Sequence, residues 1–132
     1  KSSGVTPVSD NLLQFDQHEF GSSSDGFGDI GYVYVPTTCQ KGASCALHMV
    51  FHGCEQTLND IGTDYVLHTG YLELAEANGI ILLFPQVHSS LIKNPKGCYD
   101  WWGYTNANYA FKNGPQMAAV QKMMLRLMGN DK

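Results

Sequence analysis

Charged residues are scarce in this 132-residue chain, where they make up 15% against about a quarter in an average soluble domain. Eight Lys and Arg stand against twelve Asp and Glu, so the net charge is −4, and the basic residues are scattered rather than clustered. This balance excludes a nucleic acid or an anionic membrane surface as the partner. Hydrophobic residues still reach 43%, which excludes a disordered chain.

Long apolar runs are also missing. The longest uninterrupted run, at residues 80–84, has five residues, far short of the roughly 20 that a bilayer-spanning helix needs. An apolar leader and an initiator Met are absent too, since the chain begins at Lys1, and this indicates a mature or processed product. The length suits one hydrophobic core, so we expect residues 1–132 to form a single domain or subdomain.

Metal-site spacings such as CxxC and HExxH do not occur, so the sequence predicts no metal and no cofactor. The four cysteines form an even set: Cys39, Cys45, Cys54 and Cys98. An even set in a sparsely charged chain that is rich in Gly and Tyr favours a secreted protein with two disulfides.

A catalytic nucleophile is missing as well. The GxSxG pattern of a serine nucleophile elbow does not occur, and the nearest approach, at residues 21–25, fails at the last position and precedes no predicted helix. Cysteines that form disulfides supply no thiolate. A catalytic histidine needs a nucleophile within hydrogen-bond reach, and none can be assigned to the histidines outside the one motif discussed below: His18, His48, His68 and His88.

The patterns that are present predict strands in two groups. Residues 12–20 and 31–35 have strand character on either side of a run of Gly, Ser and Asp, which predicts an antiparallel pair at a sheet edge. Residues 46–51 and 80–84 are short apolar runs, typical of parallel strands that are buried on both faces.

A helix is predicted at residues 64–78, between the two apolar runs, with Gly70 as a weak point and Gly79 as its C-cap. Residues 46–84 therefore make one β-α-β unit with parallel strands. Two antiparallel edge strands and this unit indicate an α/β fold, with a sheet of about four strands.

The last third of the chain predicts a long loop at residues 86–113 and a helix that begins at Pro115. One face of this helix would be lined by apolar residues that pack into the core: Met117, Val120, Met124, Leu127 and Met128. Two helices cannot cover both faces and both edges of a four-stranded sheet, so the sheet is expected to be incomplete without a partner segment.

Two motifs point to a site. Residues 52–56, His-Gly-Cys-Glu-Gln, follow a predicted buried strand, where ligands meet open α/β sheets. In α/β hydrolases a His-Gly-x segment here supplies one N–H of an oxyanion hole, which would be that of Cys54. The alternative is a structural histidine followed by an ordinary turn.

The second motif is the aromatic cluster at residues 98–104. It either contacts a sugar or an apolar polymer, or forms a small buried core.

Taken together, several segments resemble secreted polyhydroxybutyrate depolymerases, and more specifically the C-terminal part of their circularly permuted fungal type, which has an α/β-hydrolase fold. The segments that carry the resemblance are HGCEQ at 52–56, TGY at 69–71, LFPQ at 83–86 and NPKGCYDWWG at 94–103. The resemblance implies a partial α/β-hydrolase fold whose Ser, Asp and His triad lies N-terminal to the residues present here.

The resemblance also implies roles for particular residues. Cys54 would donate its backbone N–H to the oxyanion hole, and the disulfides would be Cys39–Cys45 and Cys54–Cys98. Tyr99 stands where a Trp is expected, which leaves the polymer preference open. The substrate would be bound by residues of the two motifs: His52, Gly53, Gln56, Tyr99, Asp100, Trp101 and Trp102.

We therefore expect one part, or one chain, of a secreted serine esterase that acts on an ester or polyester. Its partner would be a triad-bearing N-terminal segment or a second chain. The alternative is a non-catalytic, lectin-like or polymer-binding protein that keeps the same fold and binds carbohydrate or polymer through the aromatic loop.

Overall fold

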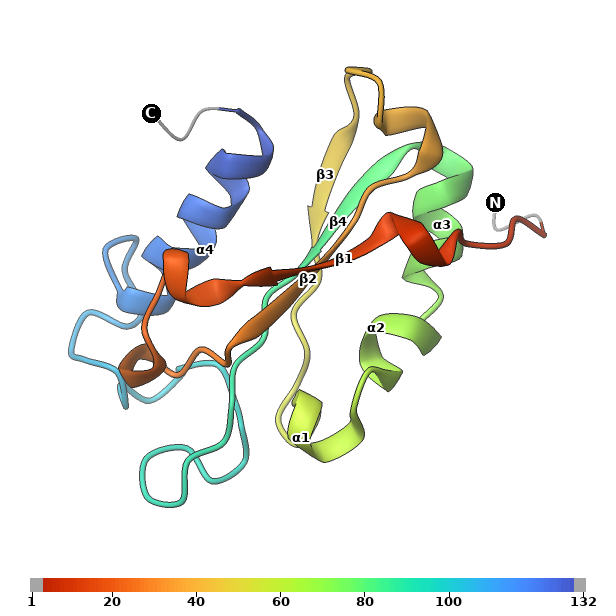
Figure 1. Cartoon of the computed structure of the whole chain (residues 1–132). Coiled ribbons are helices and arrows are strands. Elements are labelled where there is room, and N and C mark those ends of the chain that lie inside the picture. Colours follow the sequence, from red (N-terminus) through yellow and green to blue (C-terminus); the bar gives the residue numbers. More distant parts are fainter. Residues whose placement is uncertain (1–3, 130–132) are drawn as a thin grey trace.

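The computed structural model describes residues 4–129 and contains a four-stranded mixed sheet with helices on both faces (Figure 1). The sheet order is β1-β2-β4-β3. The pairs β1/β2 and β2/β4 are antiparallel, and β3/β4 is parallel. The α/β class, the antiparallel pair and the β-α-β unit are thus confirmed. The strands are β1 (Leu12–Asp16), β2 (Ile30–Tyr34), β3 (Ala46–Met49) and β4 (Ile80–Phe84).

Two strand predictions need correction. β1 ends at Asp16, short of residue 20, because the Asp16 carboxylate accepts the His18 N–H and caps a short 3-10 helix, Gln17–Glu19. β3 is not buried on both faces. It pairs only with β4, so it forms an edge of the sheet, and its residues alternate between exposed and half-buried.

The predicted single helix at 64–78 is also wrong. The chain forms three short helices there and in the preceding turn: α1 (Leu58–Ile61), α2 (Asp64–His68) and α3 (Tyr71–Asn78). Gly70 separates α2 from α3 with a φ of +81°, which interrupts the helical backbone. Gly79 is the C-cap of α3 with a φ of +63°, as predicted.

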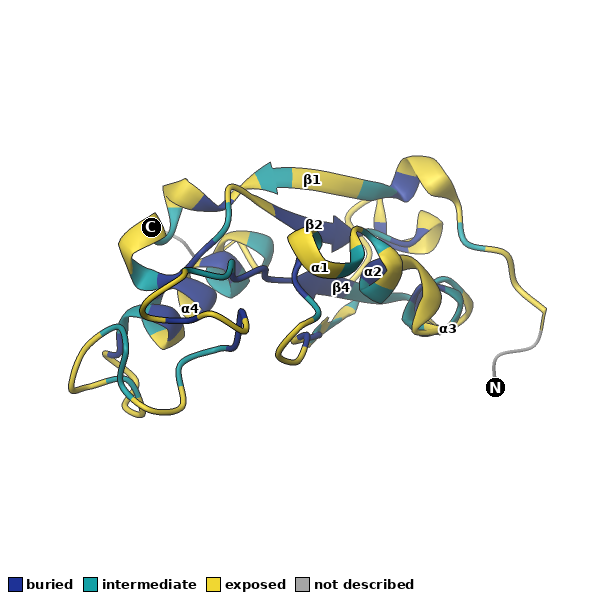
Figure 2. Cartoon of the chain, turned by 90° about the horizontal axis from the view of Figure 1, so that it is seen from below, coloured by how far each residue is buried: buried dark blue, intermediate teal, exposed yellow. Residues whose placement is uncertain are grey.

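The helices α1 to α3 lie on one side of the sheet, and α4 (Pro115–Leu127) lies on the other (Figure 1). Each side has its own buried cluster, and dark-blue segments run through the sheet and along the inner face of α4 in Figure 2. On the α2/α3 side the cluster contains Tyr32, Tyr34, Val50, Val66, Leu72, Ala75, Leu82 and Phe84. On the α4 side it contains Phe27, Leu83, Ala119, Val120 and Met123.

The buried face of α4 differs from the prediction. Its buried residues are Gln116, Ala119, Val120 and Met123, whereas Met117 and Met128 are 53% and 55% exposed. The helix is turned so that the Gln116 carboxamide reaches inward: its Oε1 accepts the Asp100 N–H, and its Nε2 donates to the Asp25 carbonyl. A prediction from the spacing of apolar residues cannot show that a polar residue, here Gln116, lies on the buried face of the helix.

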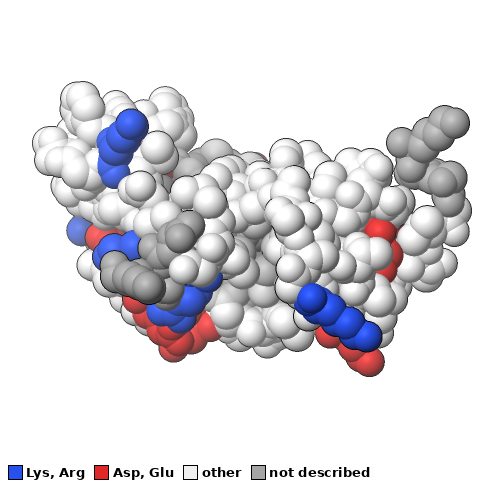
Figure 3. Space-filling view, turned by 90° about the horizontal axis from the view of Figure 1, so that it is seen from above, with Lys and Arg blue, Asp and Glu red and all other residues white. Residues whose placement is uncertain are grey.

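Charged side chains are sparse on the surface seen in Figure 3, where they form small separate groups. Among residues 4–129, no helix has the length and apolar character required to cross a bilayer.

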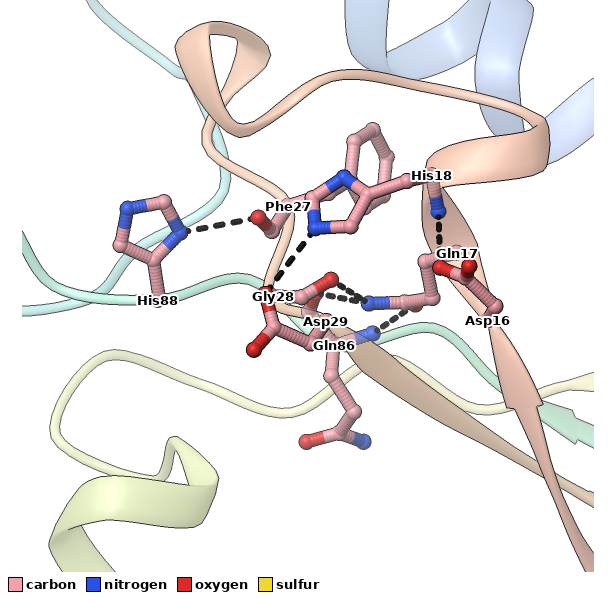
Figure 4. A network of polar contacts seen from close by, with 8 residues as sticks. All are labelled: Asp16, Gln17, His18, Phe27, Gly28, Asp29, Gln86 and His88. Atoms are coloured by element: carbon pink, nitrogen blue, oxygen red, sulfur yellow. Dashed lines mark hydrogen bonds and ion pairs between the residues drawn. The ribbon is translucent and has the colours of Figure 1, made fainter.

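The Gln17 side chain joins three segments that meet at one end of the sheet (Figure 4). It is fully buried, its Nε2 donates to the carbonyls of Gly28 and Gln86, and its Oε1 accepts the Gln86 N–H, each at 2.8 Å. Beyond the ends of β1 and β4, the Gln17 carboxamide thus forms the hydrogen bonds that hold the neighbouring backbone segments together.

Replacing Gln17 with Leu should destabilise the protein by about 3 kcal/mol, because buried backbone groups would lose their partner. Urea denaturation measures this difference. The matched control is Gln14→Leu, at an exposed position with one long contact to Tyr32, where the change should stay within about 0.5 kcal/mol. Equal stability of the two variants would contradict the role assigned to Gln17.

Candidate functional site

Both disulfides are formed as the resemblance implied, Cys39–Cys45 and Cys54–Cys98, and no described cysteine is free. They differ in what they connect. Cys39–Cys45 closes a separation of six residues, whereas Cys54–Cys98 spans 44 and ties the end of β3 to the long loop. On chain entropy alone the longer closure stabilises by about 4 kcal/mol and the shorter by about 2 kcal/mol.

The His52 ring lies in the interior, 3% exposed, just beyond the end of β3. Its Nδ1 is 2.8 Å from the Gly53 carbonyl and its Nε2 accepts the Val87 N–H at 3.2 Å, so Nδ1 carries the proton of the neutral ring. Burial lowers the pKa of His52 from its usual value. The ring thus ties the end of β3 to the segment after β4, and its nitrogens are already engaged.

The turn that follows leaves the Cys54 backbone N–H free, between two N–H groups that are engaged. The Gly53 N–H donates to the Gln56 side chain at 2.7 Å, and the Glu55 N–H donates to the Lys96 carbonyl at 2.7 Å. Between them the Cys54 N–H donates to no group of residues 4–129, and Cys54 is exposed. Glu55 is held at a φ of +60°, uncommon for a residue with a side chain, so this turn has a specific, constrained shape.

The long loop is confirmed: residues 85–114 contain no helix or strand of the described structure. It is held by polar side chains instead. Asn94 is 1% exposed, its Oδ1 accepts the Cys98 N–H, and its Nδ2 donates to the Cys98 carbonyl and to the Tyr104 hydroxyl. Gly97 packs against Thr57 so closely that a Cβ there would collide with the Thr57 methyl. The loop is therefore seated against the start of α1.

Asp100 organises the second half of the loop. Its carboxylate accepts the N–H groups of Trp102, Gly103, Tyr104 and Thr105, and also the Thr105 hydroxyl. Burial by itself would raise the pKa of the Asp100 carboxyl, but these hydrogen bonds outweigh burial and lower it. The carboxylate is thus occupied in shaping the loop around the tryptophans.

The aromatic residues of the cluster are divided between interior and surface. Tyr99 packs its ring against His52 and Phe51 and donates its hydroxyl to the Pro85 carbonyl at 2.6 Å. Burial raises the pKa of Tyr99 well above its usual value. Trp101 and Trp102 are 70% and 41% exposed, with ring centroids 5.2 Å apart. The cluster is therefore partly a small core and partly an exposed apolar surface.

A cavity of about 500 Å³ opens beside this surface. Its walls are largely aromatic and aliphatic, and we call it the Trp101 crevice. It is lined by Phe51, Tyr99, Trp101, Tyr109 and Met117, among others. The exposed Met117 side chain that the sequence had placed in the core thus forms part of this wall.

Among the described residues, no serine is paired with a histidine in the way that a catalytic triad requires. No serine hydroxyl in residues 4–129 is hydrogen-bonded to a histidine. The histidine contacts go elsewhere: His18 to Asp29, His68 to Asp64, His88 to the Phe27 carbonyl, and the His48 ring stacks on Tyr71.

Four residues that position the site were not found from the sequence: Gln17, Asn94, Lys96 and Gln116. Each acts through hydrogen bonds to backbone or through a contact distant in sequence, such as the ion pair between Lys96 and Glu55. The only sequence signal was that Asn94 and Lys96 lie in the segment that carries the resemblance.

The comparisons with known proteins agree with this geometry. A poly(3-hydroxybutyrate) depolymerase of Delftia acidovorans is 44% identical over 119 residues, which are 89% of this chain and 23% of that protein. A polyhydroxybutyrate depolymerase of Talaromyces funiculosus is 38% identical over 125 residues, which cover 36% of it. The chain is a partial homologue of polyhydroxybutyrate depolymerases. It spans about a quarter to a third of the length of these relatives.

A similar match is found among solved structures. The crystal structure of the polyhydroxybutyrate depolymerase of Penicillium funiculosum superposes with a TM-score of 0.84 and 31% identity. The match covers 98% of this chain and 43% of that one. A depolymerase variant complexed with an R3HB trimer superposes with a TM-score of 0.83. The depolymerase homologue thus has part of an α/β-hydrolase fold. No protein-family model matches the chain.

The Asp100 hydrogen bonds predict a pH dependence. Because the folded-state pKa of Asp100 is lowered, this group adds stability above its ordinary pKa near 3.8 and loses that contribution as the pH falls through the lower folded-state value. An Asp100→Asn variant should be less stable at pH 7 and should lose less stability than the wild type between pH 5 and pH 2.

Denaturant unfolding at a series of pH values tests this expectation. The control is Asp64→Asn, an exposed carboxylate on α2 whose contact is with His68. If Asp100→Asn and Asp64→Asn changed the acid dependence equally, the hydrogen bonds of Asp100 would not be its cause.

Proposed function

We propose that this chain is part of a secreted serine esterase that hydrolyses polyesters of hydroxy acids, and that it supplies one N–H of the oxyanion hole and an aromatic wall of the substrate crevice. The Ser, His and Asp of the triad would belong to a segment outside these 132 residues, either N-terminal to them or in a second chain. The observation that carries the proposal is the exposed, unpartnered Cys54 N–H at the carboxyl end of β3.

The free edge of β3 supports this arrangement. A parallel strand added there would lie about 4.8 Å from β3, and its carboxyl end would be beside the Cys54 N–H. A strand added at the other edge, beyond β1, would be about four strand spacings away in the order β1-β2-β4-β3. The β3 edge is therefore where a nucleophile at a strand end can reach the Cys54 N–H.

The Cys54 N–H would act on the charge that develops during ester cleavage. The serine Oγ attacks the ester carbonyl carbon while the histidine takes the hydroxyl proton, and the carbonyl oxygen becomes an oxyanion. The fixed Cys54 N–H would donate to that oxyanion, together with a second donor on the triad-bearing segment. Glu55, Gln56 and Lys96 would keep the turn in place, since they hold the N–H groups on either side.

The apolar character of the surrounding surface suits a polyester. The Trp101 crevice has aromatic walls, and the long loop also exposes Leu91 and Ile92 almost completely, at 97% and 94%. The relatives named above are depolymerases of poly(3-hydroxybutyrate), and one related structure contains an R3HB trimer. We extend that substrate class to this chain. The two disulfides and this homology also favour an extracellular location.

The test begins with the native mass of the natural material, measured without reduction. We expect a triad-bearing segment with a GxSxG motif, on the same or an associated chain, and hydrolysis of an activated ester that a serine-directed phosphonate abolishes. In that assembly, Gln56→Leu should lower kcat by 10-fold or more with little change in KM, because Gln56 positions the turn of the oxyanion donor.

The control variant is Gln121→Leu, an exposed residue of α4, which should leave both constants unchanged. If the isolated 132-residue chain, folded and monomeric, hydrolysed the ester in a phosphonate-sensitive way, the placement of the triad outside this chain would be wrong. A kcat for Gln56→Leu equal to that of the control would remove the oxyanion assignment.

A second candidate function is binding without catalysis, of carbohydrate or polymer. The 70% exposure of Trp101 and the absence of a serine–histidine pair from the described residues favour it. If no triad-bearing segment accompanies the chain, this function predicts saturable binding of soluble sugars or of polymer particles, lost at least 10-fold in the double variant Trp101→Ala, Trp102→Ala. Unchanged binding in that variant, measured by sedimentation with the particles, would reject it.

A further inference from the structure

A second cavity, of about 360 Å³, lies beyond the carboxyl end of β4 and has no assigned role. It is bounded by the start of β2, the start of α1 and the segment that follows β4. It shares no lining residue with the Trp101 crevice. We call it the Gln86 cavity, after a lining residue whose side-chain amide makes one long contact within the protein.

The Gln86 side chain is buried and almost without partners. Its backbone is held by Gln17, and the residue is 2% exposed. The side-chain Nε2 makes one long contact of 3.4 Å with the Phe84 carbonyl, and Oε1 accepts no hydrogen bond from any residue between 4 and 129. Figure 4 shows this amide turned away from Gln17 and toward α1, which borders the cavity. Among residues 4–129 the fully enclosed side-chain atom without a partner is Glu73 Oε2, so Gln86 Oε1 is reached from the cavity and can accept a hydrogen bond from a molecule there.

The other polar groups around the cavity define what it could bind. His88 Nδ1 lies 3.0 Å from the Phe27 carbonyl, which can only accept, so Nε2 of the neutral ring is an acceptor. Asn59 and Ser23 add an amide and a hydroxyl, and the Asp29 carboxylate is paired with His18. No Lys or Arg lines the cavity.

These groups favour a neutral ligand that donates hydroxyl hydrogens. Gln86 Oε1, His88 Nε2 and Asp29 all accept, and no Lys or Arg lines the cavity to pair with an anion. The volume lies at the small end of ligand cavities, which run from about 300 to 1,000 Å³. We propose that the Gln86 cavity binds a small, uncharged, hydroxyl-bearing molecule, whose free hydroxyl donates to Gln86 Oε1.

Sugars and hydroxy-acid esters share this chemistry, and the experiment separates them. Isothermal titration of the protein in its native assembly uses glucose, cellobiose and methyl 3-hydroxybutyrate as neutral probes, and sodium 3-hydroxybutyrate as the anionic one. We expect saturable binding of at least one neutral probe and at least 10-fold weaker binding of the anion. The NMR signal of the Gln86 side-chain amide should shift with the same probe.

The decisive variant is Gln86→Leu. It should weaken binding of that probe at least 10-fold, while the Tm of the free protein stays nearly unchanged, because the amide that is removed makes one long hydrogen bond within the protein. The double variant Trp101→Ala, Trp102→Ala should bind the probe as the wild type does, which separates this cavity from the crevice and from the proposed esterase site.

The proposal is overturned if no neutral probe binds, so that water alone fills the cavity, or if Gln86→Leu binds as tightly as the wild type. Loss of binding in the tryptophan variant would assign the probe to the crevice instead. If Gln86→Leu fails to fold, Asn59→Ala, at an exposed position on the cavity wall, takes its place, and unchanged affinity in that variant overturns the proposal equally.

Discussion

The covalent link between Cys54 and Cys98 is the constraint on which the candidate site depends. It joins the turn after β3 to a loop of almost thirty residues that has no secondary structure of its own. The Glu55 N–H bond to the Lys96 carbonyl and the ion pair of the same two residues reinforce the link. Together these contacts fix the turn that carries the Cys54 N–H relative to the aromatic loop.

Within the loop, single polar side chains hydrogen-bond to the backbone groups that would be paired between strands in a sheet. Asn94 and Asp100 each gather several backbone groups, and Gln116 attaches the loop to α4. Gln17 does the same between β1, β2 and the segment after β4. A loop held in this way, with Tyr99 packed on Phe51 and His52, can present Trp101 to solvent at 70% exposure and still position it.

Within residues 4–129 the sheet has helices on both faces, β3 has one unpaired edge, and the apolar Met117 side chain is exposed next to the crevice. The chain also spans 43% of the related crystal structure. These features support the proposed arrangement, in which a further segment would continue the sheet at β3 and bring a nucleophile to the Cys54 N–H. The Gln86 cavity stands apart, since its walls come from β2, α1 and the end of β4.

Sequence alone determined the element order, the parallel β3/β4 pair, the Gly79 cap and the lack of a serine elbow, because these depend on local composition and short-range periodicity. Through the resemblance it also indicated both disulfide pairs. It could not show that Gly70 divides the helix in two, since a glycine inside a helical pattern is compatible with either outcome. It also predicted β3 as a strand buried on both faces, because an apolar run has the same pattern whether or not a neighbouring segment covers the strand.

Only the tertiary structure decided which groups are free. His52 and Asp100 were candidates for binding, and the fold engages both in holding backbone. Cys54 and Gln86 became prominent for the opposite reason: among residues 4–129 the Cys54 N–H has no acceptor and Gln86 Oε1 has no donor. Whether a polar group has a partner depends on segments that are distant in sequence, such as Lys96 for Glu55 or Gln17 for Gln86, and no local pattern records those distances.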